Sequence, residues 1–440
     1  MLKLKLFAVT LAAAVSISTQ AAEISEEVIN NSFHPYKNGV PSYPGLSVGM
    51  TIDQSNVDQF KEILDPAMYQ FIKAGDTSIT VGETTSFDLH QSYVDATRKY
   101  SAGVTLGAGN GELSETVAGR PFPEEPSLDD PRAGEKLAWN FKYGYNWGDS
   151  AAIKPFYWVM RNMDSGKKER TLKFNFNFLN YTHRTTQEPL PKITPNPSNL
   201  FRGTYAMVLE PFDVKNTQLL IHRFEDDTKL DNAYLYLGFQ RRVRRLSSGQ
   251  TTDAFLGTDL MIEDFEGYNG RVSDMQWKFL GTKNILLPFY NHNDLTSFDT
   301  EIHQNDEDGF QMVAYGGKGG CFPEVSYQLR KVYVLESSPI DKSHPISKRL
   351  HFIDAQTFTM PRNVLYDRKG DMWKSFTIGQ AHPDHHLAIN KGSGVSIDDA
   401  VTMIDIQANH CTTAQFKGIV DPSLSPLDKF TVQNMRTSGS

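Results

Sequence analysis

The chain has 440 residues, with 44 lysines and arginines against 52 aspartates and glutamates, so its net charge at pH 7 is −8. This acidic balance excludes a general binder of nucleic acid or of anionic membranes, because both classes of protein carry a basic surface. Any basic patch must be local. The length leaves room for one large core or two smaller ones.

The first 22 residues have the pattern of a secretory signal peptide. Lys3 and Lys5 make a positive start, residues 6–17 are small or apolar, and Ala21 or Ala22 offers a cleavage site. The alternative is a membrane anchor, but the apolar stretch is shorter than the roughly 20 residues that a spanning helix needs. No cysteine stands near the cleavage site to accept a lipid. We therefore expect a soluble, unlipidated protein of the periplasm, with no transmembrane segment after cleavage.

The next part of the chain is predicted to be an extended arm followed by short helices. Residues 23–50 are rich in Asn, Ser, Pro and Gly and show no sustained period. Residues 51–150 form the helical part, in which Pro66 should divide a first run into two short helices. Residues 107–131 are rich in Gly, Pro and acids and predict a loop. The helical runs are Asn56–Lys73, Asp88–Tyr100 and Gly134–Trp147.

From residue 171 the period changes from helical to alternating. Phe174, Phe176 and Phe178 should share one face of a strand. A strand meander over residues 171–380, inside one domain of residues 51–410, predicts an α+β fold, mainly antiparallel β, with a strongly curved sheet covered by the N-terminal helices. Residues 411–440 are expected to be a C-terminal extension. The predicted strands are Leu172–Tyr181, Tyr205–Leu209, Gln218–Phe224, Ala233–Phe239, Met275–Leu280, Arg330–Glu336, Arg349–Asp354, Val364–Arg368 and Met372–Ile378.

A four-arginine run follows one of these strands. Simple alternation puts Tyr234, Tyr236, Arg242 and Arg244 on the same face. The guanidinium groups could bind an anionic head group, since they present a planar fork to carboxylate or phosphate oxygens. They could equally be neutralised inside the protein by the acidic residues that follow, which are Asp253, Asp259, Glu263, Asp264 and Glu266.

Four motifs in order resemble those of the uncharacterised domain family 1329, a large relative of the LolA/LolB-like outer-membrane lipoprotein carriers. The motifs are YLYLGFQRRVRRL, FLGTDLMIEDFEGYNGR, KRLHFIDAQTF and LYDRKGDMWK. The resemblance runs from about Pro41 to about His410. It implies an incomplete barrel that binds hydrophobic cargo in the envelope of a Gram-negative bacterium, with an inner-membrane efflux-type transporter and an outer-membrane protein as partners. The family has no agreed biochemical activity.

The aromatic strand faces are the predicted ligand site. A lipid or other hydrophobic molecule would lie against these side chains, with its head group at Arg242 and Arg244. The alternative is that the aromatic rings only pack beneath the helices. We expect a binding or carrier protein without catalytic residues, cofactor or metal. The predicted aromatic contacts are Phe174, Phe176, Phe178, Tyr234, Tyr236 and Trp277.

Two other readings stay open. His382, Asp384, His385 and His386 could bind zinc in a metal-assisted hydrolase of the envelope, although their spacing matches no metallohydrolase signature. The second alternative is a non-catalytic scaffold, in which the protein's own side chains fill the groove.

The chain has two cysteines, Cys321 and Cys411. In an oxidising compartment they are expected to form one disulfide, with two buried free thiols as the alternative.

Overall fold

The computed structural model describes residues 24–114, 116–246, 252–302 and 309–439. The predicted signal peptide lies outside the described residues. None of the described helices is both long enough and apolar enough to cross a bilayer.

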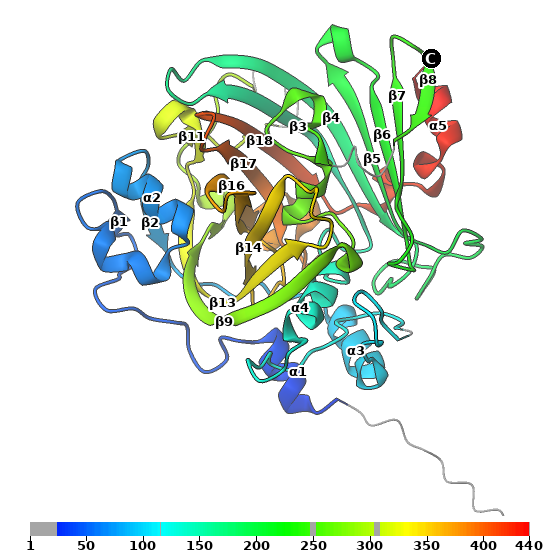
Figure 1. Cartoon of the computed structure of the whole chain (residues 1–440), viewed down its shortest axis with the longest axis horizontal. Helices are drawn as coiled ribbons and strands as arrows, with labels where there is room; N and C mark the ends of the chain where they lie inside the picture. The colour runs from blue at the N-terminus through cyan, green and yellow to red at the C-terminus, as the bar shows by residue number, and fades with distance from the viewer. Residues whose placement is uncertain (1–23, 115, 247–251, 303–308, 440) are drawn as a thin grey trace, which may run out of the picture.

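One large, strongly curved sheet of 16 strands dominates the fold (Figure 1). Its main run has the spatial order β9–β13–β14–β15–β16–β17–β18–β3–β4–β5–β6–β7–β8, in which neighbours pair antiparallel. Within the described residues, neither β8 nor β9 has a second strand partner, so the barrel is incomplete. The predicted fold class is confirmed. The strands of the run are β3 (Ser150–Asn162), β4 (Lys168–Asn180), β5 (Leu200–Glu210), β6 (Gln218–Phe224), β7 (Asn232–Leu237), β8 (Arg242–Arg245), β9 (Met275–Leu287), β13 (Ser326–Pro339), β14 (Ile346–Asp354), β15 (Arg362–Asp367), β16 (Met372–Ala381), β17 (Ile397–Asp405) and β18 (His410–Ile419).

Short strands extend this sheet. The β1 (Thr51–Ile52) and β2 (Ile79–Gly82) pair lies against the start of β13, where β2 runs parallel to it. Strand β10 (Phe289–Tyr290) pairs in parallel with the end of β16. Strands β11 (Tyr315–Gly316) and β12 (Phe322–Pro323) form a separate two-stranded sheet.

Two meanders in chain order, β3 to β8 and β13 to β18, are joined where β18 pairs with β3. The sequence predicted strands in both meanders but missed β3, β8, β17 and β18. The expectation of a C-terminal extension from residue 411 is wrong, because residues 410–419 form a strand in the middle of the sheet.

The helices are α1 (Glu26–Phe33), α2 (Pro66–Ala74), α3 (Gln91–Tyr100), α4 (Ala133–Lys142) and α5 (Val432–Ser438). The predicted division at Pro66 is confirmed: a 3₁₀ helix over Val57–Ile63 ends before it, and Pro66 is the first residue of α2. The prediction of a wholly extended arm is wrong over α1. There Ser25 caps the helix by accepting a hydrogen bond from Val28 N.

The sheet curls around a concave face, on which side chains of distant strands meet. Phe176 of β4 and Phe376 of β16 belong to one apolar cluster, although three strands lie between theirs. Helix α4 covers the β9, β13 and β14 part of this face. Helix α2 packs on the opposite face, where Asp65, at its N-cap, accepts from buried Arg362 of β15 with a separation of 2.8 Å.

Candidate functional site: the concave face and its inserted segment

An aromatic layer covers the concave face. Phe174, Phe176 and Phe178 are all buried there, which confirms the predicted alternation along β4. They pack with rings from the neighbouring strand β3 and from β18. The ring centres of Phe156 and Phe416 are 4.3 Å apart, which makes this layer dense.

The chain between the two sheet edges fills this concavity. Residues 255–266, here the inserted segment, lie between β8 and β9 and contain only 3₁₀ turns. Phe255 and Phe265 meet Trp158 of β3 edge-on, with ring centres 5.8 and 5.9 Å apart. Leu260, Met261 and Ile262 are buried in the same cluster. The inserted segment thus occupies the place that was predicted for a ligand.

Carboxylates fix the inserted segment to the strands. His410 Nδ1 of β18 is 2.8 Å from Asp259, and Arg202 of β5 is 3.1 Å from Glu266. Arg349 of β14, which is fully buried, donates to Glu263 at 3.1 Å and to Asp264 at 2.9 Å. Four of the five acids, Asp259, Glu263, Asp264 and Glu266, therefore do not neutralise the arginine run, because they pair with bases of distant strands instead.

Burial and the neighbouring charges shift the pKa values of two of these carboxylates in opposite directions. Burial by itself would raise the pKa of Glu263, but Arg349 and His344 outweigh it and hold this pKa below its usual range. For Asp264, burial prevails over the attraction of Arg349, and its pKa is raised. Both groups depend on the guanidinium of Arg349, since an ionised carboxylate is costly to bury without a cation.

A small cavity of about 50 Å³ remains between the inserted segment and the aromatic layer, with Phe178, Phe265 and Asp398 among its lining residues. Burial raises the pKa of Asp398 to about 7. One water molecule takes roughly 30 Å³ in the liquid. An acyl chain would therefore require the inserted segment to move.

The other predicted ligand contacts lie elsewhere. Tyr234 and Tyr236 point to the opposite face of β7, where α5 covers them and the Tyr236 hydroxyl donates to the carbonyl oxygen of Gly439 at 3.0 Å. Trp277 of β9 lies in the cluster under α4 and donates to the carbonyl oxygen of Val272 at 2.8 Å. The predicted aromatic set is thus brought together only at Phe174, Phe176 and Phe178.

The arginines do not share a face with the tyrosines. In the β7–β8 pair, Leu235 stands opposite Arg244 and Leu237 opposite Arg242, so both arginines lie on the concave side of an edge strand. Their side chains are exposed. Neither forms an ion pair with any residue that the structure describes.

Of the four candidate zinc ligands, His382, Asp384 and His385 stay together in one turn, whereas His386 points elsewhere. His382 contacts the carbonyl oxygen of Ser86 at 3.0 Å, and Asp384 accepts from the backbone N–H of Gly392 at 2.7 Å. The ring of His385, in the 3₁₀ turn Pro383–His385, has its centre 5.2 Å from that of the His382 ring.

His386 instead meets two residues that the sequence did not suggest. Its Nε2 is 3.1 Å from one carboxylate oxygen of Asp399, and His292 Nδ1 is 2.7 Å from the other. The three ligand atoms lie within 4.8 Å of one another, a spacing compatible with a metal ion. However, Tyr290 also donates to Asp399, and Asn390 donates to Nδ1 of His386. The group is already a complete buried hydrogen-bond network.

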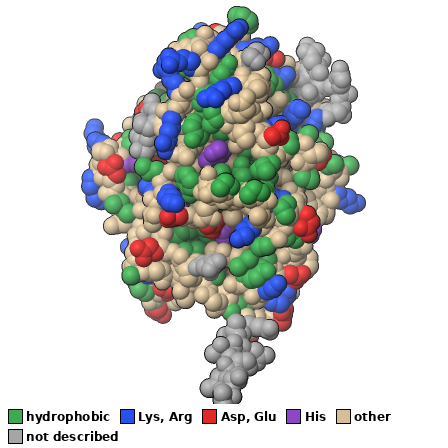
Figure 2. All heavy atoms as spheres, turned by 90° about the vertical axis from the view of Figure 1, so that its right-hand side faces the viewer, with side chains coloured by type: hydrophobic (Ala, Val, Ile, Leu, Met, Phe, Trp, Pro, Cys, Tyr) green, Lys and Arg blue, Asp and Glu red, His purple; other side chains and the backbone are tan. Residues whose placement is uncertain are grey.

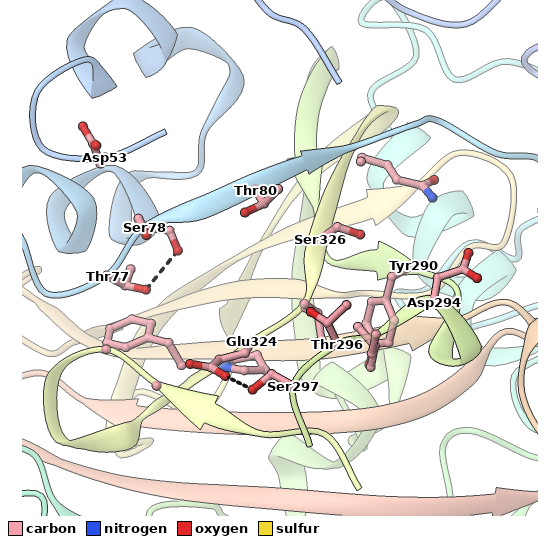
Figure 3. Close-up of a pocket in the computed structure, with 18 of the residues that line it drawn as sticks. Asp53, Thr77, Ser78, Thr80, Tyr290, Asp294, Thr296, Ser297, Glu324 and Ser326 are labelled. Carbon is pink, nitrogen blue, oxygen red and sulfur yellow. Dashed lines mark hydrogen bonds between the residues drawn. The ribbon is translucent and has the colours of Figure 1, made fainter. Parts of the chain in front are cut away.

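A separate polar groove of about 1140 Å³ opens beside β2 (Figure 3). Ser297 donates to Glu324 on one wall, while Asp53, Thr77 and Ser78 lie on another. The described lining residues include no lysine or arginine. Sequence reasoning missed this groove because its walls come from separate stretches of the chain.

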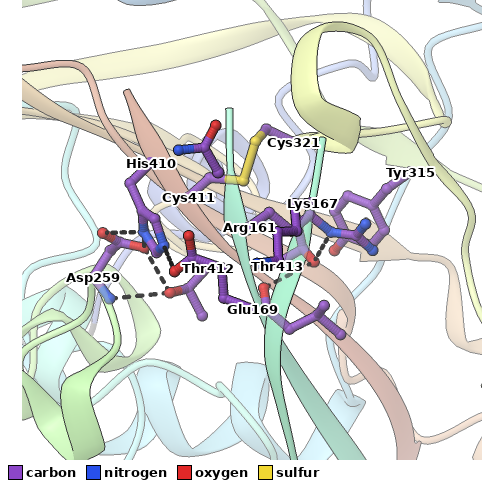
Figure 4. Close-up of a disulfide and its surroundings, with 12 residues drawn as sticks. Arg161, Lys167, Glu169, Asp259, Tyr315, Cys321, His410, Cys411, Thr412 and Thr413 are labelled. Atoms are coloured by element: carbon purple, nitrogen blue, oxygen red, sulfur yellow. Dashed lines mark hydrogen bonds and ion pairs between the residues drawn. A yellow bond between two sulfur atoms is a disulfide. The ribbon is translucent and has the colours of Figure 1, made fainter. Parts of the chain in front are cut away.

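The predicted disulfide between Cys321 and Cys411 is confirmed (Figure 4). It ties the β12 region to one face of β18. His410 and Thr412, on either side of Cys411, point to the other face, where both contact Asp259. Three consecutive residues of β18 therefore fix structure on both faces of the sheet.

Comparisons with known proteins give a family but no activity. The model of the family described as "Protein of unknown function (DUF1329)" matches residues 51–436. The uncharacterized protein PA3922 of Pseudomonas aeruginosa is 25% identical over 350 residues, which cover 76% of this chain and 69% of that protein.

Three solved structures are similar to this chain at low identity. A putative outer membrane lipoprotein-sorting protein domain from Vibrio parahaemolyticus is 17% identical and covers 70% of this chain and 100% of its own, with a TM-score of 0.46. A DUF1329 family protein from Desulfovibrio piger is 16% identical over 70% of this chain and 99% of its own, with a TM-score of 0.46. The LolA superfamily protein NE2245 from Nitrosomonas europaea is 13% identical over 65% and 91%, with a TM-score of 0.36.

The family match covers nearly all of the described chain, and it agrees with the four motifs on which the resemblance was based. The chain belongs to the DUF1329 family of proteins of unknown function.

Proposed function

We propose that this protein binds a hydrophobic or amphiphilic molecule against its concave face, and that the inserted segment covers this face when the molecule is absent. One observation carries the proposal. The aromatic layer of the concave face is closed by a segment without α-helix or strand, which ion pairs to β14 and β18 hold in place. Displacement of such a segment breaks no strand pairing.

Replacing the contacts of the inserted segment with those of a bound lipid is energetically reasonable. Each buried CH₂ group contributes about 0.8 kcal/mol, so an acyl chain of about 16 carbons offers on the order of 10 kcal/mol to replace the contacts of the segment. Phe174, Phe176 and Phe178 are the proposed contacts of the apolar part. Arg242 and Arg244, at the edge of the same concave side, are the proposed contacts of an anionic head group.

The proposed location is the periplasm, on the basis of the signal-like N-terminus. The proposed role is transport of the bound molecule between the inner and outer membranes, with an efflux-type transporter and an outer-membrane protein as partners. This role rests on the family resemblance. Catalysis has no part in the proposal.

The test is hydrogen exchange of the inserted segment with and without a long-chain lysophospholipid, together with mass spectrometry of organic extracts from the purified protein. We expect a bound hydrophobe in the extract, and faster exchange in residues 255–266 when the lipid is added. Helix α5, on the opposite face, serves as the internal control and should not change. An Arg242→Ala, Arg244→Ala double variant should retain less of the amphiphile.

Two results would overturn the proposal. A clean extract from folded protein that also refuses the lipid would exclude a carrier. Bound lipid that leaves the exchange of residues 255–266 unchanged would place the binding site outside the concave face.

A further inference from the structure

Two turns stand together at one end of the sheet. The β5–β6 turn and the β7–β8 turn are in contact, since a Cβ atom placed on Gly238 would come within 2.4 Å of the carbonyl oxygen of Lys215. Each turn exposes a phenylalanine: Phe212 is 92% exposed and Phe239 is 74% exposed. These are the most exposed large apolar side chains among the described residues. Figure 2 shows this end at the top, with a hydrophobic side chain at the apex.

Cations lie in the same two turns and on the strand that follows. Lys215 and Arg241 lie in the turns, and Arg242, Arg244 and Arg245 follow on β8. None of the five forms an ion pair with any described residue. The nearby Asp213 is already paired with Arg170. Lys and Arg side chains gather below the apex in Figure 2. This end is therefore positive although the chain as a whole has a net charge of −8.

The charges lie on both faces of the edge strand β8. Arg242 and Arg244 lie on the concave side of β8, whereas Arg245 stands opposite Tyr234 on the other side. Guanidinium groups on both sides of a strand suit a plane of phosphates better than a single anionic side chain.

We propose that this end, the Phe212/Phe239 tip, docks on the surface of an anionic lipid bilayer. The two rings would enter the interfacial layer, and the surrounding cations would contact lipid phosphates. Both rings stand out from the surface, since Phe212 is 92% and Phe239 is 74% exposed. The acidic remainder of the protein would be repelled by the same surface, so only the tip would approach it.

The test is sedimentation of the full chain with vesicles of phosphatidylcholine alone or with about 30% phosphatidylglycerol. Lys215→Gln with Arg241→Gln removes tip charge without touching Arg242 and Arg244, which the cargo proposal uses. Phe212→Ser with Phe239→Ser removes the rings. The matched control, Ile389→Ser with Lys391→Gln, changes an exposed apolar residue and an exposed cation in the loop between β16 and β17, at the opposite ends of the strands.

We expect the wild type and the control to bind anionic vesicles equally, more weakly at high salt, and each tip variant to bind at least tenfold more weakly. Failure of the wild type to bind anionic vesicles, or equal binding to neutral ones, would overturn the proposal. So would tip variants that bind like the control. Because each substitution is on an exposed side chain, unchanged circular dichroism will show that the variants are folded.

Discussion

His410, the first residue of β18, holds Asp259 of the inserted segment with its Nδ1 atom 2.8 Å from the carboxylate. The hydrogen bond to Asp259 raises the pKa of this histidine. A raised pKa in the folded state means that the pair stabilises the protein fully below the ordinary histidine pKa of about 6.5. This stabilisation is lost as the pH rises through the higher pKa that His410 has in the folded protein.

We expect His410→Gln to loosen the inserted segment at low pH only. Since the pair is partly exposed, its contribution is at most about 1 kcal/mol. The measurement is the protection factor of amides in residues 255–266 at pH 5.5 and pH 8.5. Wild type should lose protection between these values, and the variant should not. A variant that follows the wild-type pH profile would show that the pair does not control the segment.

Arg349→Met should be among the most destabilising single substitutions in the protein. It would leave Glu263 and Asp264 buried without their guanidinium, at a cost of about 3 to 5 kcal/mol. Urea denaturation would measure the free energy of unfolding. The matched control is Arg244→Met, on an exposed side chain, which should change it by less than about 0.5 kcal/mol. Similar losses in the two variants would contradict the assigned role of Arg349.

Asp398→Asn should stabilise the protein at alkaline pH. Burial raises the pKa of Asp398 to about 7, so the folded state holds this proton more tightly than the unfolded state does. Stability from this group is fully present below about pH 4 and is lost as the pH rises through about 7. At pH 8 the variant should gain about 2 to 4 kcal/mol over wild type. An equal difference at pH 5 and pH 8 would refute this assignment.

Removal of the disulfide with Cys321→Ala and Cys411→Ala should lower the free energy of unfolding. The bond joins residues 90 positions apart, and a loop of this size corresponds to about 4 to 5 kcal/mol in the chain-entropy model. Thermal unfolding with and without reductant would measure the loss. Reductant should destabilise wild type and leave the double variant unaffected. A wild type that is insensitive to reductant even when unfolded would mean that the bond does not form.

The clearest strand in the sequence is β4, whose two faces differ over much of its length. Alternation along β4 is clear because its phenylalanines enter the concave core, while Lys173 and Asn175 on the other face are partly exposed. Strands β17 and β18 are buried on both faces, so their sequences do not alternate, and the threonines and aspartates of β17 and β18 gave no strand signal. Strand β3 is also buried on both faces over most of its length, and it contains Pro155.

The site was harder to predict because its contacts are long-range. Simple alternation was carried through the β7–β8 turn, but a hairpin turn resets the register, and Tyr236 and Arg242 therefore face opposite ways. The base that holds Asp259 lies 151 residues away, and the base that holds Glu263 lies 86 residues away. Local spacing carries no information on such partners.

The pairing of β18 with β3 has a consequence for the order of folding. Each meander can form from neighbouring hairpins, but the contact between Thr413 and Val159 closes a loop of 254 residues. In a chain made from its N-terminus, the two half-sheets become one only after residues 410–419 have been made. Such non-local closure is slow and leaves strand edges exposed in the meantime. A chain that ends before residue 410 would keep β3–β8 and β13–β17 but lose β18, the strand that joins them, and such a truncation should lead to aggregation.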